Sequence, residues 1–152
     1  MNKAQFIELL NDDLKNEYTH MLFYLHYAAM VEGLHRFEVR EFLLEEAKSE
    51  MLHVDEFAHV ITGLGGQPIP ASKEFPADMT CPYDILSYAI HMEREVVANY
   101  AARMKQTDEL HGSLAWEDVD SDAAYVHVFM EDNVKDSRKT VDELLKVIKH
   151  AD

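Results

Sequence analysis

Glycine and proline are confined to a few short segments, and this distribution divides the chain into four long stretches with apolar residues at helical spacing. The 152 residues include only 5 glycines and 4 prolines, so little interrupts the periodicity of amphipathic helices. The first helix is expected to begin after Asn2, a good N-cap with Gln5 three residues later. The expected stretches are residues 2–33, 36–63 and 83–106, and a fourth that begins between residues 116 and 123 and continues almost to the C-terminus.

The lengths of the connections indicate how these helices are arranged. The first and last connections are short, near residues 33–35 and 107–117, and short loops join antiparallel neighbours. The middle connection is long and rich in helix breakers, from Gly65 to Pro82. We therefore expect one all-α domain over residues 1–152, an antiparallel four-helix bundle. The lengths fit one long crossover between the second and third helices, and they also fit a simple up-and-down bundle.

Each expected helix carries an apolar stripe that a glutamate interrupts near the middle of the helix. Because the stripes of a bundle face one another, four carboxylates are expected to meet in the interior. Ionised carboxylates are costly to bury, and like charges repel, unless cations or hydrogen bonds compensate them. Bound divalent cations would compensate the charge, and partial solvation or hydrogen bonds to tyrosine or arginine are the alternative. The four glutamates are Glu17, Glu50, Glu93 and Glu131.

Histidines accompany two of these glutamates at a spacing that suits metal binding. The pattern Glu-x-x-His occurs four times, and it places two potential ligands on one helical face. Only the pairs that end at His20 and His53 begin at a stripe glutamate, and the pairs that begin at residues 32 and 56 are interpreted as surface residues. His53 is the best candidate ligand. Carboxylates with a little imidazole suit iron or manganese.

Two motifs and the spacing between them resemble a known family. Residues 46–55 read EAKSEMLHVD and are followed by GGQP at 65–68, and the first helix has Asn16-Glu17 with Tyr24 two turns later. Glu93 follows His53 by 40 residues. Over roughly residues 5–105 these features resemble bacterioferritins, which belong to the ferritin-like di-iron superfamily.

This resemblance implies a ferritin-like bundle with one long crossover and a di-iron ferroxidase centre. Glu17 and His53 would ligate one metal, Glu50 would bridge, and Glu93 would ligate the second metal. Tyr24 would lie beside the centre as a hydrogen-bonding or redox-active group, and a core tyrosine is the alternative interpretation. In the family, dioxygen or peroxide oxidises ferrous iron, and a homo-oligomeric cage often stores the product.

The fourth helix departs from the family pattern. Its carboxylate is Glu131, but Val134 occupies the position where the family has histidine. His127 or His20 could supply the missing imidazole, and otherwise the second site is weak, empty or dependent on water. Met51 matches the position at which bacterioferritins bind haem between two subunits, and methionine is also an ordinary core residue.

The leading prediction is an iron-binding, bacterioferritin-like protein that oxidises or stores iron. The alternatives are another ferritin-like enzyme, such as a rubrerythrin-like peroxidase or an oxidase, and a scaffold bundle without metal chemistry. The net charge of −15 argues against nucleic acid as a partner, and no apolar stretch approaches the ~20 residues of a membrane span. One cysteine, Cys81, excludes an internal disulfide. The N-terminal residues lack the apolar block of a signal peptide, so a cytoplasmic protein is expected.

Overall fold

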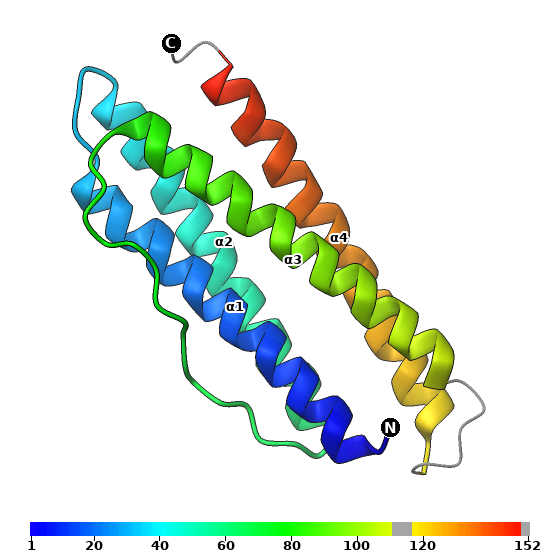
Figure 1. Ribbon diagram of the computed structural model, residues 1–152. Helices are drawn as coiled ribbons and strands as arrows, with labels where there is room; N and C mark the ends of the chain where they lie inside the picture. Colours follow the sequence, from blue (N-terminus) through cyan, green and yellow to red (C-terminus); the bar gives the residue numbers. More distant parts are fainter. Residues whose placement is uncertain (111–116, 150–152) are drawn as a thin grey trace.

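The computed structural model describes residues 1–110 and 117–149, and within them the chain forms four α-helices and no strand. Figure 1 shows them as two hairpins lying side by side, with a long connection between the second and third helices. The predicted antiparallel four-helix bundle with one long crossover is therefore confirmed. The helices are α1 (Lys3–Met30), α2 (Arg36–Gly63), α3 (Pro82–Leu110) and α4 (Val119–Ile148).

The ends of the helices follow local chemistry. Asn2 caps α1 as predicted, because its side chain accepts from the Gln5 amide and the Gln5 side chain accepts from the Asn2 amide, each at 2.9 Å. Helix α1 ends three residues before Gly33, whose φ of +111° is left-handed. Helix α3 begins at Pro82, which suits a first turn because it has no amide hydrogen to leave unpaired.

The last turn of α3 was expected to be part of a loop, and this expectation was wrong. Residues 107–110 are helical, because Thr107 and Leu110 are buried and neither glycine nor proline interrupts the turn. Helix α4 begins at Val119, inside the predicted interval. The expected connection around Gly112 and the earliest expected start of α4 at Trp116 lie outside the described residues.

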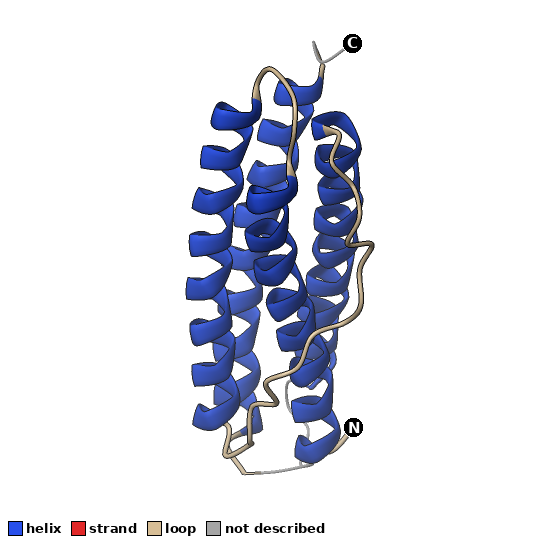
Figure 2. Ribbon diagram, turned by 90° about the vertical axis from the view of Figure 1, so that its left-hand side faces the viewer, coloured by secondary structure: helices blue, strands red, loops and turns tan. Residues whose placement is uncertain are grey.

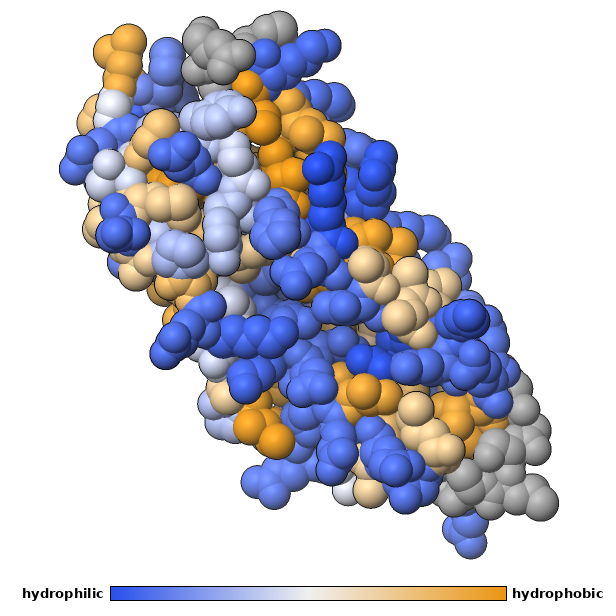
Figure 3. Space-filling model, viewed as in Figure 1, coloured by the Kyte–Doolittle hydropathy of each residue, from blue (hydrophilic) through white to orange (hydrophobic). Residues whose placement is uncertain are grey.

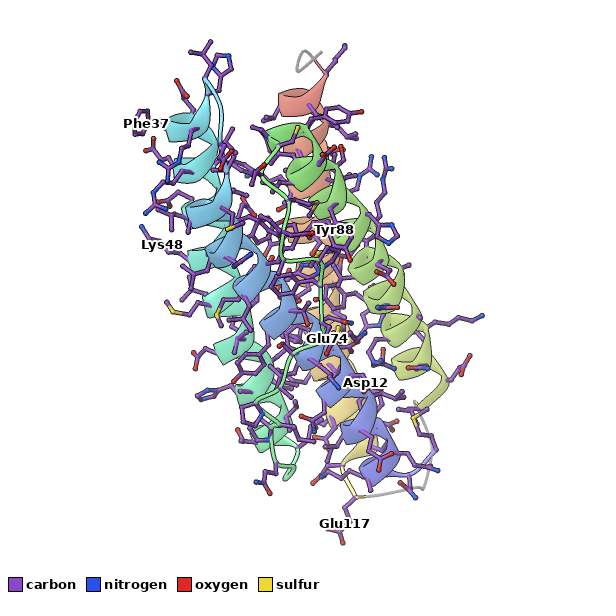
Figure 4. The ribbon with its side chains drawn as sticks, turned by 60° about the vertical axis from the view of Figure 1, so that its left-hand side comes forward. Asp12, Phe37, Lys48, Glu74, Tyr88 and Glu117 are labelled. Carbon is purple, nitrogen blue, oxygen red and sulfur yellow. The ribbon has the colours of Figure 1, made fainter. Side chains whose placement is uncertain are left out.

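The crossover, residues 64–81, runs the length of the bundle and makes α2 and α3 parallel (Figure 2). Helix α1 packs extensively against α2, and α3 against α4, whereas α1 and α3 touch less. The crossover is fixed to α1 by hydrogen bonds from the Lys73 amide to Thr19 Oγ1 (2.8 Å) and between His26 Nε2 and the Ala77 carbonyl (2.7 Å). Glu74 of the crossover and Tyr88 of α3 lie along this side of the bundle in Figure 4.

The core has two apolar layers, and a polar layer lies between them. One layer is formed by the N-terminal part of α1, the C-terminal part of α2 and the parts of α3 and α4 beside them, and it includes Leu10, Leu14, Phe57, Val96, Tyr100, Val126 and Met130. The other layer lies at the opposite end and includes Phe23, Tyr27, Leu43, Ala47, Ile85, Leu86, Val141 and Leu144. Along each helix, the buried polar residues Glu17, His20, Glu50, Glu93, Asn133 and Ser137 fall between these two sets.

A buried ion pair joins α1 to α3. The Arg103 guanidinium donates to both carboxylate oxygens of Asp13, at 2.9 and 3.2 Å, and to the Leu9 carbonyl at 3.2 Å. Arg103 also donates to the side chain of Gln106. Asp13 is 1% exposed and Arg103 6%, so the pair is shielded from water and fixes the register of the two helices.

The face drawn in Figure 3 is predominantly hydrophilic, with small apolar patches. Phe37 and Lys48 point away from α2 in Figure 4. Besides Phe37, the exposed apolar side chains of the first hairpin include Leu22, Leu25, Met51 and Leu52. In the part of the chain that the structure describes, no helix is long and apolar enough to cross a membrane.

Candidate metal centre

Three of the four stripe glutamates meet in the polar layer. Glu17 of α1, Glu50 of α2 and Glu93 of α3 are 2%, 4% and 1% exposed. Each occupies a core-facing position of its helix between apolar neighbours, as the periodicity predicted. Within the described ranges, no lysine or arginine forms an ion pair with any of them. Among the described residues, the groups that can bring positive charge to these carboxylates are therefore the imidazoles of His20 and His53.

The first group of donors combines Glu17, Glu50 and His53. His53 Nδ1 lies 3.2 Å from Glu50 Oε2 and 3.4 Å from Glu17 Oε2. The spacing of three residues along α2 brings His53 to the same face as Glu50. The ligand atoms of the group all lie within 4.8 Å of one another, which is compact enough for one ion bound by oxygen and nitrogen atoms.

The second group combines His20, Glu50 and Glu93. His20 Nδ1 lies 3.4 Å from Glu93 Oε1 and 3.9 Å from Glu50 Oε1. Glu50 thus turns one oxygen toward each group, which is the arrangement of a bridging carboxylate. His20, 4% exposed on α1, supplies the imidazole that α4 lacks.

Tyr24 is tied to the second group. Its hydroxyl donates to Glu93 Oε1 at 2.8 Å, and the side chain is 1% exposed. Burial, followed by the negative charges of Glu93 and Glu50, raises the pKa of Tyr24 well above its usual value. The hydroxyl therefore stays protonated and holds the Glu93 carboxylate in one orientation.

Burial and mutual contact strongly perturb the titration of these groups. Burial, and then the neighbouring Glu50, raises the pKa of Glu17 well above its usual value. Burial would lower the pKa of His53, but its hydrogen bonds and charge interactions with Glu17 and Glu50 outweigh burial and raise this pKa to about 11. For His20, the charges and hydrogen bonds of Glu93 and Glu50 likewise outweigh burial and raise the pKa.

Glu50 behaves in the opposite way. Burial would raise its pKa, but hydrogen bonds from Glu17, His20 and His53 outweigh burial and lower the pKa below its usual value. These shifts all favour protons on the groups around Glu50: the pKa values of His20, His53 and Glu17 are raised, and that of Glu50 is lowered. Metal ions would replace these protons.

One carboxylate oxygen of the centre has an ion-pair contact with His53 but no hydrogen bond to the described part of the chain. Glu17 Oε2 makes no hydrogen bond to the described part of the chain, although it is fully enclosed and lies 3.4 Å from His53 Nδ1. An orphaned carboxylate oxygen in a dry interior is costly, and a cation would satisfy it. The donor set of carboxylate oxygen and imidazole nitrogen fits iron or manganese.

The expectation that Glu131 joins the other three glutamates was wrong. Its side chain is 49% exposed and pairs with Lys135 on the surface of α4. The helix is rotated by one residue, about 100°, from the predicted stripe. Asn133 and Ser137, which are 3% and 5% exposed, occupy the core-facing positions at the level of the carboxylates.

Two further residues differ from their expected places. His127 was a candidate substitute ligand, but it is half-exposed and interacts with Thr107 Oγ1 (3.1 Å) and Asp108 Oδ1 (3.2 Å), far along α4 from Ser137. For Met51, the alternative to haem binding was an ordinary core residue, but its side chain is 55% exposed on α2. An exposed methionine could reach haem only where a second subunit covers it, and haem binding stays a prediction.

Sequence patterns missed two acidic residues beside the centre. Asp136 of α4 places Oδ2 3.6 Å from His53 Nε2, and nothing in the local sequence marks this contact between helices. Glu46 lies one turn before Glu50. Burial, and then the charges of Glu93 and Glu50, raise its pKa to about 7. The spacing of four residues to Glu50 was the available signal for Glu46.

Comparison with known proteins agrees with this geometry. Residues 7–118 match the family model described as Ferritin-like domain. Among solved structures, one of the ferritin-like, diiron-carboxylate proteins from Bacillus anthracis str. Ames is 28% identical, with a TM-score of 0.80 and 96% of each chain covered. A Dps protein from Bacillus brevis is 17% identical, with a TM-score of 0.82 and 96% of each chain covered.

A bacterioferritin from Rhodobacter capsulatus is 20% identical to the chain, with a TM-score of 0.79, covering 96% of this chain and 84% of that one. The Dps protein and the bacterioferritin are too distant in sequence to indicate more than a shared fold. Among curated protein sequences, none matches the chain.

Proposed function

The chain belongs to the ferritin-like domain family, and from this premise we propose that it binds two iron ions in the bundle and oxidises ferrous iron there. The observation that carries the proposal is the pair of buried three-donor groups that share Glu50. Their carboxylates have no lysine or arginine partner in the described part of the chain, and Glu17 Oε2 is buried without a hydrogen bond there. A pair of divalent cations would compensate the charge of the carboxylates in place of protons.

Each residue has a distinct task in the proposed centre. Glu17 and His53 hold one ion, His20 and Glu93 hold the other, and Glu50 contacts both. Tyr24 fixes Glu93 through its 2.8 Å hydrogen bond. Iron bound here supplies one-electron redox chemistry, and the apolar layers on both sides limit access of water to the reacting ions.

Ferrous iron is the substrate in this proposal, and dioxygen or hydrogen peroxide is the oxidant. Two ferrous ions lose two electrons, which with two protons reduce one hydrogen peroxide to two waters or one dioxygen to hydrogen peroxide. Because neither donor group includes a residue of α4, this centre has fewer carboxylate ligands than four converging glutamates would supply.

The experiment compares two glutamates that differ only in where the structure places them. Ferrous iron is titrated anaerobically into wild-type protein, Glu50→Gln and Glu131→Gln, and then oxygen or peroxide is added. We expect up to two ions per wild-type chain and a rise of ferric near-ultraviolet absorbance. Glu50→Gln should bind less iron and oxidise it at least ~10-fold more slowly, because both groups lose a charged ligand.

Glu131→Gln is the matched control and should behave as the wild type, because Glu131 is exposed. Equal binding and equal rates in Glu50→Gln and wild type would refute the centre. Normal binding without oxidation by either oxidant would refute the oxidation step alone. The two oxidant arms also separate a ferroxidase that uses oxygen from a peroxidase.

Assembly into a homo-oligomer is part of the proposal. It is supported by the large apolar side chains that the first hairpin exposes, including Leu25 (52%) and Leu52 (61%), because subunit contacts typically cover exposed apolar side chains. Light scattering coupled to size-exclusion chromatography measures the assembled mass. A monomer at micromolar concentration would contradict assembly and, with it, storage of oxidised iron in a cage.

A further inference from the structure

We propose that Asp136 of α4 is a positioning residue for the metal centre: its carboxylate forms an ion pair with His53 Nε2 and so keeps His53 Nδ1 turned toward Glu17 and Glu50. This inference rests on the proposed function and extends it to a residue outside the five donors. It also assigns a role to α4, which contributes no carboxylate or imidazole to either three-donor group.

The geometry around His53 separates its two ring nitrogens. Nδ1 lies 3.2 Å from Glu50 Oε2 and 3.4 Å from Glu17 Oε2, on the inner side of the bundle. Nε2 lies 3.6 Å from Asp136 Oδ2, on the outer side. The imidazole therefore spans the distance between the buried carboxylates of α1 and α2 and the surface of α4.

Asp136 reaches His53 through a groove between α2 and α4. The residues lining the groove include Glu46, Ser49, Lys139 and Thr140 besides these two. Side-chain exposure is 12% for His53 and 63% for Asp136, so the pair lies where the protein interior meets solvent. In the described ranges, Asp136 is the carboxylate that forms an ion pair with Nε2.

The chemistry of metal-bound histidine explains how the contact with Asp136 could affect metal binding. A histidine that binds metal through one nitrogen usually donates its other N–H to a carboxylate, carbonyl or water, and this bond fixes the tautomer and the ring orientation. Loss of such a partner typically weakens metal binding by about 10- to 100-fold. Because Asp136 is largely exposed and water can take its place, we expect a loss near the lower limit.

The test uses Co2+ as the probe, since it does not oxidise readily and its visible absorption reports the geometry of its ligands. Wild-type protein, Asp136→Ala, Asp136→Asn and Asp136→Glu are titrated with Co2+. Asp132→Ala is the matched control, because Asp132 is an exposed acid one turn earlier on α4 and its loss changes the net charge equally. Nitrogen-15 NMR of labelled histidines, in metal-free protein, reports the state of each imidazole.

We expect Asp136→Ala to weaken Co2+ binding by about 10-fold relative to Asp132→Ala and to alter the visible spectrum. Asp136→Glu should recover most of the affinity, and Asp136→Asn part of it, because an amide oxygen still accepts a hydrogen bond. The nitrogen-15 signals of His53 should move in Asp136→Ala, while those of His20 should not.

Equal Co2+ affinity in Asp136→Ala and Asp132→Ala would overturn the inference, and so would unmoved His53 signals in metal-free Asp136→Ala. These results leave the proposed centre intact if the wild-type protein binds Co2+. A wild-type protein that binds no Co2+ refutes the centre itself and the role of Asp136 with it. The two failures are therefore distinguishable.

Discussion

Replacement of Arg103 by methionine tests how much the buried ion pair between α1 and α3 contributes to the free energy of unfolding. The substitution preserves most of the aliphatic stem and removes the guanidinium that donates to both oxygens of Asp13. Asp13 is 1% exposed, so water cannot replace the lost donors. The variant leaves a carboxylate in the core without a partner.

The size of the expected loss of stability follows from the environment of Asp13. Breaking a buried pair by removal of one partner costs roughly 3–5 kcal/mol when the remaining group is charged. Burial raises the pKa of Asp13 to about 6 even though the hydrogen bond and charge of Arg103 oppose this rise. When Asp13 is protonated, the variant loses only hydrogen bonds, at about 1 kcal/mol each.

The contribution of Asp13 to the free energy of unfolding changes with pH in a defined direction. The pKa of Asp13 is higher in the folded state, about 6, than its ordinary value of 3.8, so the folded protein binds this proton more tightly. The contribution of Asp13 to the free energy of unfolding therefore decreases as pH rises from about 4 to 6 and is constant above. In Arg103→Met the folded pKa rises further, so the decrease continues above pH 6 and the variant is most destabilised near pH 8.

Urea unfolding of metal-free protein measures this effect, because bound metal would add its own stabilisation. With a slope of ~1–3 kcal/mol/M for a domain of this size, we expect the midpoint to fall by about 2 M at pH 8 and by much less at pH 5. Arg138→Met is the control: its pair with Asp142 is exposed and should contribute ~0–1 kcal/mol. A loss that is below 1 kcal/mol at pH 8, or equal at both pH values, would refute the reasoning.

Three further predictions concern the metal centre and the connection between α1 and α2. Because His53 has a pKa raised to about 11 and must lose its proton to bind metal, Co2+ affinity should fall between pH 8 and 6; calorimetry that shows no dependence on buffer ionisation would contradict this. Tyr24→Phe removes the hydroxyl that donates to Glu93 and should weaken the second Co2+ binding step several-fold but not the first, as a two-step titration measures. Gly33→Ala, at φ +111°, should cost about 1–2 kcal/mol in thermal unfolding, whereas Gly63→Ala, in open space within α2, should not destabilise.

Apolar periodicity predicted the inner faces of three helices correctly. On α2, for example, Leu43, Glu50 and Phe57 share the buried face as the spacing required. On each of these helices the apolar residues before and after the glutamate on the predicted stripe are buried together with it. The rotation then determines where Glu17, Glu50 and Glu93 point.

On α4 two stripes offset by one residue compete, and periodicity alone did not choose between them. The stripe through Glu131 contains a carboxylate and matched the other helices. The observed stripe contains Val126 and Met130, both 0% exposed, and its polar members are Asn133 and Ser137. The observed rotation buries Val126 and Met130. It also leaves Glu131 exposed, where its charge stays hydrated at no cost.

Contacts between helices were beyond the reach of local spacing. His20 was recognised only as a substitute ligand, and its 3.4 Å approach to Glu93 depends on how α1 and α3 align across the bundle. The contact of His53 with Asp136 depends likewise on the height of α4 relative to α2. Such heights are set by packing of whole layers, which no short motif encodes.

The distribution of donors between the hairpins gives the two metal positions different requirements. Glu17, Glu50 and His53 all belong to the hairpin of α1 and α2, whereas Glu93 comes from α3. One ion can therefore be held by a single hairpin, and the other only after the crossover has brought the second hairpin alongside. In the proposed centre, the ion held by His20, Glu50 and Glu93 would connect the two hairpins, so its binding would depend on how stably the hairpins pack against each other.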